Sequence, residues 1–324
     1  MITSIVLFAV GLVLLIKGGD WFVDGATGIA RRFNLPDIVV GATVVSIGTT
    51  LPEVMVSATG AMLGQGSMAY GNAIGSIICN TALIAAISVA VNPGPVNTKS
   101  MKMPVIFFFG SAAIYCVAAY ILGAFTRPMG LIMLVIFVVY LVITVRQGLK
   151  NPDAVEVEEA EDDGGKPKTL LQDVFWLILG AALIAVGADL LVEHGTIIAK
   201  GLGVPETVIA LTFVALGTSL PELVTTITSL KKGHGSLGLG NVIGANVFNL
   251  VLVSGVAVSV APFAVPMGNT IFGINSSLIL DIPLMLVVMA ILTLPSLLHK
   301  KITRAQGILL LAIYGVFAVI QFAL

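Results

Sequence analysis

Charged residues are scarce in this chain of 324 residues: Asp, Glu, Lys and Arg together make up only 10% of it, whereas soluble domains carry about a quarter. Hydrophobic residues make up 57%, and the mean hydropathy is +1.08. Basic residues form only short clusters, so nothing supports binding to nucleic acid. This balance is typical of a polytopic membrane protein whose chain lies almost entirely in the lipid bilayer.

Cysteine is equally rare. Cys79 and Cys116 both fall in apolar segments, and two buried thiols suggest neither a disulfide framework nor a zinc site. The chain has no His-Glu-x-x-His motif, which argues against a membrane-embedded zinc hydrolase. The first apolar stretch, Ile2–Ile16, lacks a basic start and a cleavage pattern of small residues. We therefore expect it to begin a membrane span and not a removable signal.

Long apolar runs, by contrast, are abundant. A membrane-spanning helix needs about 20 apolar residues, and ten segments meet this requirement: 2–30, 37–61, 69–91, 104–122, 128–146, 172–199, 205–229, 237–260, 278–298 and 305–323. An acidic stretch, Asn151–Lys168, separates the fifth span from the sixth. We expect this stretch to be a solvated linker between two halves, 1–150 and 169–324.

The distribution of Lys and Arg predicts the orientation in the membrane. If the N-terminus faces outward, 13 of the 16 basic residues fall on the inner side, where such residues normally gather. We therefore expect both termini outside and the acidic linker in the cytoplasm, with the protein in the cell (inner) membrane.

The two halves share a repeated motif. Gly48-Thr-Thr-Leu-Pro-Glu53 reappears 169 residues later as Gly217-Thr-Ser-Leu-Pro-Glu222, and Gly71-Asn72 recurs in the same register as Gly240-Asn241. Each half has an odd number of spans, so the second half must enter the membrane from the opposite side. The predicted fold is an all-α polytopic membrane protein of ten transmembrane helices arranged as two inverted five-helix repeats, an architecture of secondary transporters.

The repeated motif places Pro52 and Pro221 just before two glutamates in apolar surroundings. Proline lacks the backbone N–H and crowds the carbonyl one turn earlier, so we expect both helices to be kinked or broken here. An ionisable residue inside the membrane marks a functional site by default. Glu53 and Glu222 would converge on one central site, where two negative charges suit one Ca²⁺ or two Na⁺. The alternative is a pair of structural glutamates that are protonated or hydrogen-bonded.

Several neutral oxygen atoms lie near these glutamates in sequence. They include hydroxyl groups that could instead bond to a carbonyl one turn back, and main-chain carbonyls beside the proline. The candidate ligands are Ser46, Thr49, Thr50, Ala215, Thr218 and Ser219. Ser76 and Asn80 share one helix face, and Asn249 repeats Asn80 in the second half. We expect Asn72 and Asn241 to form interhelical hydrogen bonds, and the nearby glycines to allow close helix packing.

Taken together, Gly-Thr-[Thr/Ser]-Leu-Pro-Glu and Gly-Asn-x-Ile-Gly-x in both halves resemble the cation/Ca²⁺ antiporter superfamily, and its prokaryotic Na⁺/Ca²⁺ exchangers in particular. The resemblance implies a Ca²⁺ site at the carboxylates of Glu53 and Glu222 and the carbonyls of Thr49 and Thr218. It implies Na⁺ sites around the same glutamates that use the remaining candidates: Ser46, Thr50, Ser76, Asn80, Ala215, Ser219 and Asn249.

The resemblance further implies exchange of three Na⁺ for one Ca²⁺ by alternating access, with no enzymatic activity, no cofactor and no protein partner. In the proton-coupled branch of this superfamily the second motif carries a glutamate where this chain has Gly75 and Gly244, which favours Na⁺ coupling. A Ca²⁺/H⁺ exchanger that uses the same glutamates stays open as an alternative. A cation channel is a further alternative, against which the inverted repeat argues.

Because the acidic stretch is interpreted as a passive linker, deletion of Glu156–Asp163 should leave ion transport unchanged. The measurement is the initial rate of ⁴⁵Ca²⁺ uptake by proteoliposomes, with the amount of inserted protein as the reference. Loss of uptake at equal insertion would show that the linker takes part in transport.

Overall fold

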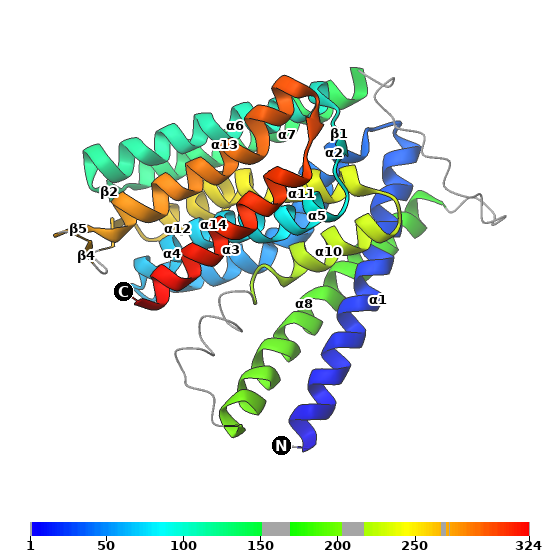
Figure 1. The fold of residues 1–324 in the computed structure, drawn as a ribbon, viewed down its shortest axis with the longest axis horizontal. Coiled ribbons are helices and arrows are strands. Elements are labelled where there is room, and N and C mark those ends of the chain that lie inside the picture. The colour runs from blue at the N-terminus through cyan, green and yellow to red at the C-terminus, as the bar shows by residue number, and fades with distance from the viewer. Residues whose placement is uncertain (1, 151–168, 203–216, 267–269, 272, 324) are drawn as a thin grey trace.

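The structure is a computed structural model that describes residues 2–150, 169–202, 217–266, 270–271 and 273–323. It is a bundle of long helices from which one helix pair projects (Figure 1). In the first half the helical segments are α1 (Ile2–Arg32), α2 (Asp37–Val40), α3 (Ser46–Met62), α4 (Gly66–Cys79), α5 (Ala86–Val91), α6 (Thr98–Cys116) and α7 (Arg127–Lys150). In the second half they are α8 (Leu170–Gly201), α10 (Leu220–Lys231), α11 (Gly235–Phe248), α12 (Ser254–Val260), α13 (Ile282–His299) and α14 (Arg304–Ala323).

Short π-helical turns connect some of these helices into continuous spans. They are η1 (Gly41–Val45), η2 (Asn80–Ala85), η3 (Val117–Leu122), η6 (Asn249–Val253) and η7 (Ser277–Asp281). Counting joined segments as one, the described part of the chain holds nine helices that are long and apolar enough to cross a membrane. They confirm nine of the ten predicted spans. Of the predicted span 205–229, residues 205–216 lie outside the described residues, and the remainder contains a turn at 217–219 and most of α10.

The largest error in a predicted boundary is at α6, which begins at Thr98 and not at residue 104. Its first turn is polar, and the Asn97 side chain caps it by accepting a hydrogen bond from the Ser100 amide at 3.2 Å. Hydropathy alone misses such a turn, because a capped helix end is favourable even where it is polar.

The loops contain short strand pairs that an all-helical prediction leaves out. β1 (Gly94–Pro95) pairs antiparallel with β6 (Lys301–Ile302), and β2 (Ala124–Phe125) pairs with β3 (Phe263–Ala264). A third pair joins β4 (Thr270–Ile271) to β5 (Ile274–Asn275). The first two pairs each tie a loop of one half to a loop of the other half, so they connect the halves at the ends of the spans.

Of the two outcomes expected at Pro52, a kink or a break, the break does not occur: α3 runs through this proline without interruption. The irregularity lies upstream, in η1, where the helix widens for one turn. The residue one turn before Pro52, whose carbonyl would have accepted a hydrogen bond from the missing N–H, is Gly48, and its lack of a side chain leaves room for the Phe22 ring. In the second half α10 does begin at the motif, with Ser219 as its N-cap residue and Pro221 in its first turn, where proline is tolerated.

The projecting pair consists of α1 and α8, which pack along their length (Figure 1). Glycines make the contact: a Cβ atom on Gly11 would lie 2.9 Å from the Gly187 carbonyl oxygen, and one on Gly18 would lie 2.9 Å from that of Gly180. The pairing order shows that the two helices are antiparallel. Small residues at seven-residue spacing therefore let the backbones approach closely, as is common between membrane helices.

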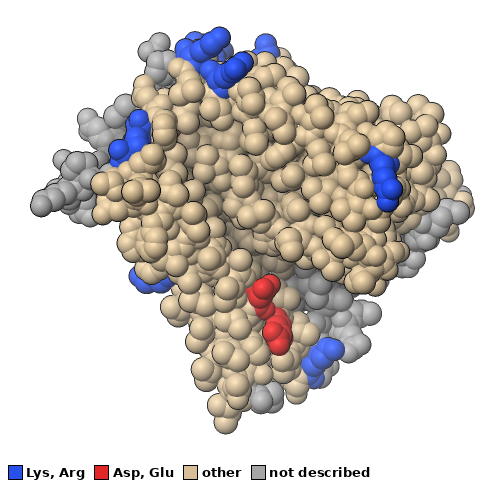
Figure 2. Space-filling view, turned by 180° about the vertical axis from the view of Figure 1, so that it is seen from behind, with Lys and Arg blue, Asp and Glu red and all other residues tan. Residues whose placement is uncertain are grey.

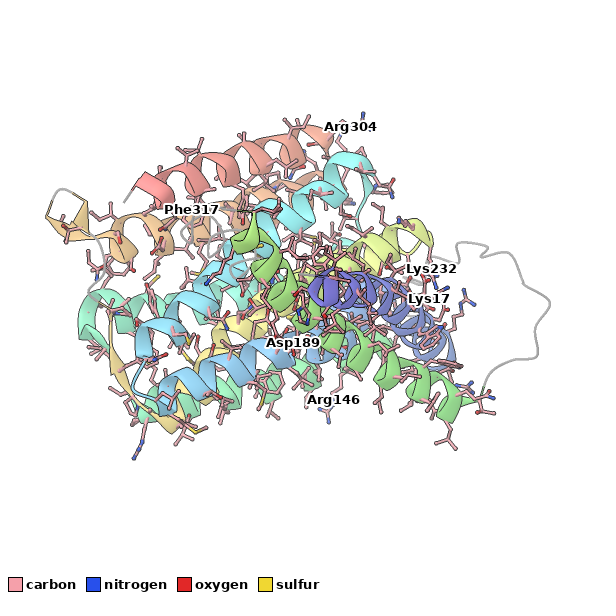
Figure 3. The ribbon with its side chains drawn as sticks, turned by 90° about the horizontal axis from the view of Figure 1, so that it is seen from below. Lys17, Arg146, Asp189, Lys232, Arg304 and Phe317 are labelled. Carbon is pink, nitrogen blue, oxygen red and sulfur yellow. The ribbon has the colours of Figure 1, made fainter. Side chains whose placement is uncertain are left out.

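Ionic contacts tie α1 to the second half near one end of the molecule. Lys232 Nζ lies 2.7 Å from Asp24 Oδ1 and 3.8 Å from Asp20 Oδ1, and Arg32 pairs with Asp173 at 3.3 Å. Figure 3 shows Lys232 beside α1, near Lys17. Elsewhere the surface is apolar: side chains such as Ile121, Leu171 and Leu298 are largely exposed, and Figure 2 shows few charged side chains on one face. Such a surface suits contact with lipid.

Substitution of Gly180 by alanine should destabilise the protein, because the new methyl group would meet the Phe22 backbone and lie 2.7 Å from the Gly18 carbonyl oxygen. Overpacking of this kind typically costs about 1–3 kcal/mol. The unfolding temperature in detergent measures the effect. Gly110→Ala is the control, since a Cβ atom there meets no described atom within 4 Å. Equal unfolding temperatures for both variants would refute close packing of α1 on α8.

Candidate cation site

Two glutamates lie at the centre of the bundle. Glu53 on α3 and Glu222 on α10 are both 0% exposed. In the described part of the chain none of their four carboxylate oxygens has a hydrogen-bond partner. The two helices pack on each other, and the two carboxyl groups lie close enough for electrostatic interaction. Two unpartnered acidic groups in one buried place are strongly unfavourable unless a proton or a cation neutralises them.

Hydroxyl groups surround the carboxyl groups. Thr49 and Thr50 of the first half lie beside the carboxyl group of Glu222 in the second half. Thr50 and Ser219 are buried, and in the described residues neither hydroxyl has a hydrogen-bond partner. Buried hydroxyls normally find partners, so their free lone pairs are suited to a hard cation, which prefers oxygen ligands.

Asn80 and Asn249 are placed by the backbone in the same way in both halves. Each is the first residue of a π-helical turn, η2 and η6 respectively, a local structure that is frequent at functional sites. Both side chains are 0% exposed, and none of their amide atoms has a partner among the described residues. α4 packs on η6 and α11 packs on η2, which brings the two asparagines into the same core.

Asn72 and Asn241 form the interhelical hydrogen bonds that the sequence predicts. Thr49 donates to Asn241 Oδ1 at 3.1 Å, and Thr218 donates to Asn72 Oδ1 at 3.4 Å. The two bonds correspond under the 169-residue offset, so an asparagine in each half accepts a hydrogen bond from a threonine of the other half. Asn72 also donates to Ser57 Oγ at 2.9 Å.

The other candidate residues are placed less uniformly. Ser46 Oγ is buried between the Gly41 and Asn241 carbonyl oxygens, at 2.8 and 3.0 Å, so its proton is engaged while its lone pairs stay available. Ser76 is buried on α4, one turn before Asn80. Thr218 is only half-buried, and its hydroxyl is used by Asn72. Ala215 lies outside the described residues.

One buried polar cluster was not predicted. Asn246 donates to Thr81 Oγ1 at 2.7 Å and to Met289 Sδ at 3.2 Å, and all three residues are 0% exposed. The second-half residue Asn246 corresponds to Ile77 in the first half, so the cluster has no internal counterpart. The signal for this cluster in the sequence is an amide side chain in the middle of an apolar helix. Comparison of the two halves does not reveal it, because the matching position holds an isoleucine.

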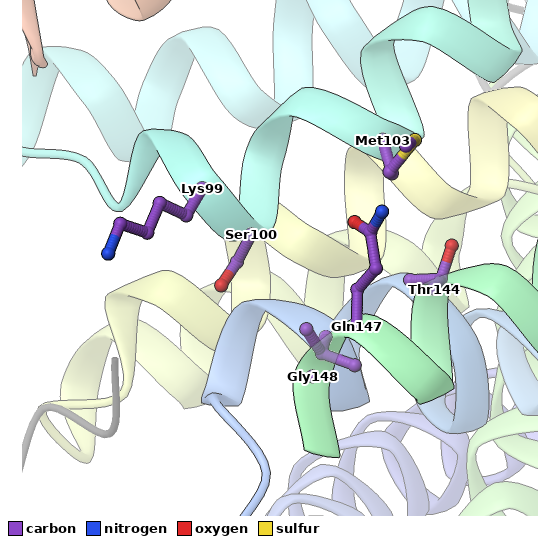
Figure 4. A pocket seen from close by; sticks show the side chains of 7 residues that line it. Lys99, Ser100, Met103, Thr144, Gln147 and Gly148 are labelled. Carbon is purple, nitrogen blue, oxygen red and sulfur yellow. The ribbon is translucent and has the colours of Figure 1, made fainter. Parts of the chain in front are cut away.

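Three cavities of the described structure lie outside the glutamate pair, and one of them lies at its edge. A crevice of about 10 Å³ runs between α1, α8 and the motifs, and it is lined by Phe22, Thr49, Pro52 and Pro221 among others. A cavity of similar size between α6 and α7 contains none of the candidate ligands (Figure 4). A larger cavity of about 300 Å³ lies at the loop 92–97.

The donor set itself limits the type of cation. In the part of the chain that the structure describes, no group of three or more His, Cys, Asp or Glu residues gathers at one point. The site therefore offers two carboxylates together with neutral hydroxyl and amide oxygens. Oxygen donors of this kind suit Na⁺ and Ca²⁺ and give no soft ligand for a transition metal.

Comparison with known proteins gives the family. The sequence pattern of the sodium/calcium exchanger protein family matches residues 3–146 and 173–323. The chain belongs to this family. It is 36% identical over 322 residues to an uncharacterized membrane protein of Methanocaldococcus jannaschii, covering 97% of this chain and 96% of that protein.

Two further similarities cover nearly the whole chain. The sodium/calcium exchanger MaX1 of Methanosarcina acetivorans is 30% identical over 99% of both chains. The structure of the sodium-calcium exchanger NCX_Mj, soaked with 2.5 mM Na⁺ and 1 mM Sr²⁺, superimposes with a TM-score of 0.79 at 32% identity over 98% of both chains. The similarity of fold thus extends over nearly the whole length of both chains.

Asn249→Asp should change cation binding, because it adds a third carboxylate to a buried site. We expect a higher affinity for cations or an altered preference between Na⁺ and Ca²⁺. The shift of the unfolding temperature with each ion measures both. An unchanged response to both ions would place residue 249 outside the ion shell.

Proposed function

We propose that this protein is a secondary antiporter that exchanges Na⁺ for Ca²⁺ across the membrane. The observation that carries the proposal is the pair Glu53 and Glu222, wholly buried and without a protein partner for any carboxylate oxygen in the described residues. Their two charges suit one Ca²⁺ or two Na⁺. The ions compete for the same carboxylates, so occupancy by one excludes the other, and this exclusion couples the two fluxes.

We propose a ligand set that the burial of the described residues and the family resemblance support. Ca²⁺ is held by the carboxylates of Glu53 and Glu222 with main-chain carbonyls of Thr49 and Thr218. Na⁺ sites around the same glutamates use the surrounding hydroxyl, amide and carbonyl oxygens: those of Ser46, Thr50, Ser76, Asn80, Ala215, Ser219 and Asn249. Three Na⁺ per Ca²⁺ would make the exchange electrogenic.

We further propose that residues 1–150 and 169–324 are inverted five-helix repeats, joined by the cytoplasmic linker 151–168, with both termini outside. Mirrored contacts support this arrangement. The contact of Gly11 with Gly187 corresponds to that of Gly18 with Gly180 under the same offset that relates the bond of Thr49 to Asn241 and the bond of Thr218 to Asn72. Reciprocal contacts of this kind are what a two-fold axis produces.

Alternating access then requires one part of the molecule to move relative to the site. The pair α1 and α8 is the proposed moving part, because its contacts with each other are extensive and it lies beside the remaining bundle (Figure 1). The narrow crevice between this pair and the two motif prolines lies where such a movement would change access to Thr49. Movement of α1 and α8 as one body would keep their glycine contact intact.

Uptake of ⁴⁵Ca²⁺ into proteoliposomes loaded with Na⁺, K⁺ or protons tests the proposal. We expect uptake driven only by an outward Na⁺ gradient, with a rate that depends on membrane potential. Uptake driven by a pH gradient without Na⁺ would assign the protein to Ca²⁺/H⁺ exchange. Turnover far above carrier rates would indicate a channel, and no uptake under any gradient would refute Ca²⁺ transport.

Glu53→Gln and Glu222→Gln provide the matched site variants. Each removes one negative charge while keeping the shape of the side chain, so each should abolish Na⁺-driven Ca²⁺ uptake and leave the protein folded. Leu171→Ala, a change at a largely exposed side chain on α8, is the control. Wild-type flux from either glutamine variant would refute the proposed site.

A further inference from the structure

Tyr140 lies in the middle of α7, outside both repeated motifs, and its side chain is 0% exposed. Its hydroxyl donates a hydrogen bond to the carbonyl oxygen of Ala42 at 2.8 Å. The residue at the corresponding position of the second half is Leu309, which cannot make such a bond. This contact therefore belongs to one half only and does not follow from the repeat.

The Ala42 carbonyl lies in the π-helical turn η1. The amides at the C-terminal end of this turn donate to the carbonyls of Gly41 and Thr43. Neither of these amides donates to the Ala42 carbonyl, which lies between those two in sequence. A buried carbonyl without a donor costs about as much as a lost hydrogen bond. Tyr140 supplies that donor, and thereby stabilises the wide turn that leads directly into Ser46.

α11 packs against the same Ala42 carbonyl, but so closely that it has no room for a side-chain donor at Gly244. A side chain at Gly244 would lie 2.7 Å from the Ala42 carbonyl oxygen and would collide with Ser46 Oγ. Position 244 therefore has to be glycine, and α11 offers only its bare backbone on that side. The phenol of Tyr140, which reaches the carbonyl from α7, is the side-chain donor that the structure records there.

The ring of Tyr140 makes a second contact, with the other half of the site. It packs edge-on against Phe248, with ring centroids 5.9 Å apart and an interplanar angle of 88°. Phe137, on the preceding turn of α7, packs on Phe248 as well, at 5.0 Å and 83°. Phe248 immediately precedes Asn249, the first residue of η6, so α7 touches the turns that present Ser46 and Asn249.

We propose that Tyr140 is a positioning residue for the Na⁺ sites, which holds Ser46 through η1 and Asn249 through Phe248. The inference rests on the proposed function. Ser46 and Asn249 belong to the ligands assigned to Na⁺, whereas the carboxylates assigned to Ca²⁺ make no direct contact with Tyr140 among the interactions of the described residues. Loss of the phenol hydroxyl therefore weakens Na⁺ binding selectively.

Tyr140→Phe tests this role, because it removes the hydroxyl and keeps the ring. Tyr115→Phe is the matched control: Tyr115 is also 0% exposed, and its hydroxyl has no hydrogen-bond partner in the described residues. Purified protein is titrated with Na⁺ alone and with Ca²⁺ alone, and the unfolding temperature is followed. For Tyr140→Phe the half-saturating Na⁺ concentration should rise roughly fivefold, the factor expected for one hydrogen bond of ordinary net strength, while that for Ca²⁺ stays within twofold.

The outcomes separate the proposals. Titrations of Tyr140→Phe that match those of Tyr115→Phe would overturn the inference. So would an equal loss of affinity for both ions together with a lower ion-free unfolding temperature, because this pattern indicates a structural role only. A wild-type protein that responds to neither ion would overturn the proposed function, and the inference with it.

A second variant tests the link to the other half. Phe248→Leu removes the ring that Tyr140 and Phe137 contact, and should also raise the half-saturating Na⁺ concentration. If Tyr140 acts through both turns, the double variant should lose less Na⁺ affinity than the product of the two single losses, since coupled residues are not additive. Fully multiplicative losses would show that Tyr140 acts on Ser46 alone and would overturn its action through Phe248.

Discussion

Two buried carboxyl groups, for which the described residues provide no ion-pair partner, are the constraint on which the rest of this structure depends. Ion pairs of Arg32, Lys232 and His234 lie near helix ends. None of them includes Glu53 or Glu222. A fixed arginine beside the glutamates would close the site permanently, because a buried pair is costly to break. Leaving the charge to exchangeable ions makes neutralisation reversible, which a carrier requires.

Several of the neutral ligands proposed for the cations lie at irregular backbone. Inside an ordinary α-helix each carbonyl accepts from an amide of the same helix, whereas the π-helical turns η1, η2 and η6 each contain one extra residue per turn and redirect the side chains next to them. Asn80 and Asn249 start two of these turns, and Ser46 follows the third. Such turns cost stability in isolation. Here they are stabilised by tertiary contacts: Tyr140 on η1, and the Ser254 hydroxyl, which donates to the Asn249 carbonyl at 2.9 Å.

The packing divides the molecule into two kinds of interface. Between α11 and η1, glycines bring backbone against backbone, and hydrogen bonds from Ser46 and Thr49 cross the contact. Between α1 and α8 the glycine contact is equally close, but it lies within the projecting pair. Among the described ionic contacts, that of Arg32 with Asp173 lies within this pair, whereas those of Asp20 and Asp24 with Lys232 join α1 to the end of α10. Tight packing within each part, and few polar ties between them, is the pattern expected of rigid bodies that move against each other.

The sequence by itself determined the membrane class, nine of the described spans and the importance of the two Gly-Thr-x-Leu-Pro-Glu motifs. Hydropathy and the cost of a buried charge are properties of a residue in a bilayer and need no knowledge of its neighbours. The sequence left open whether the helix is kinked or broken at Pro52, because this depends on what packs beside the proline, and the structure shows no break there.

Only the tertiary structure decided how the site is supported. The bond of Tyr140 to the Ala42 carbonyl, and the cluster of Asn246 with Thr81 and Met289, join residues 98 and 165 positions apart that share no motif. Neither contact has a counterpart in the other half, so the internal repeat gave no signal for it. The reason is physical: a π-helical turn leaves one particular carbonyl without its donor, and which side chain satisfies it depends on the three-dimensional path of a helix from elsewhere in the chain.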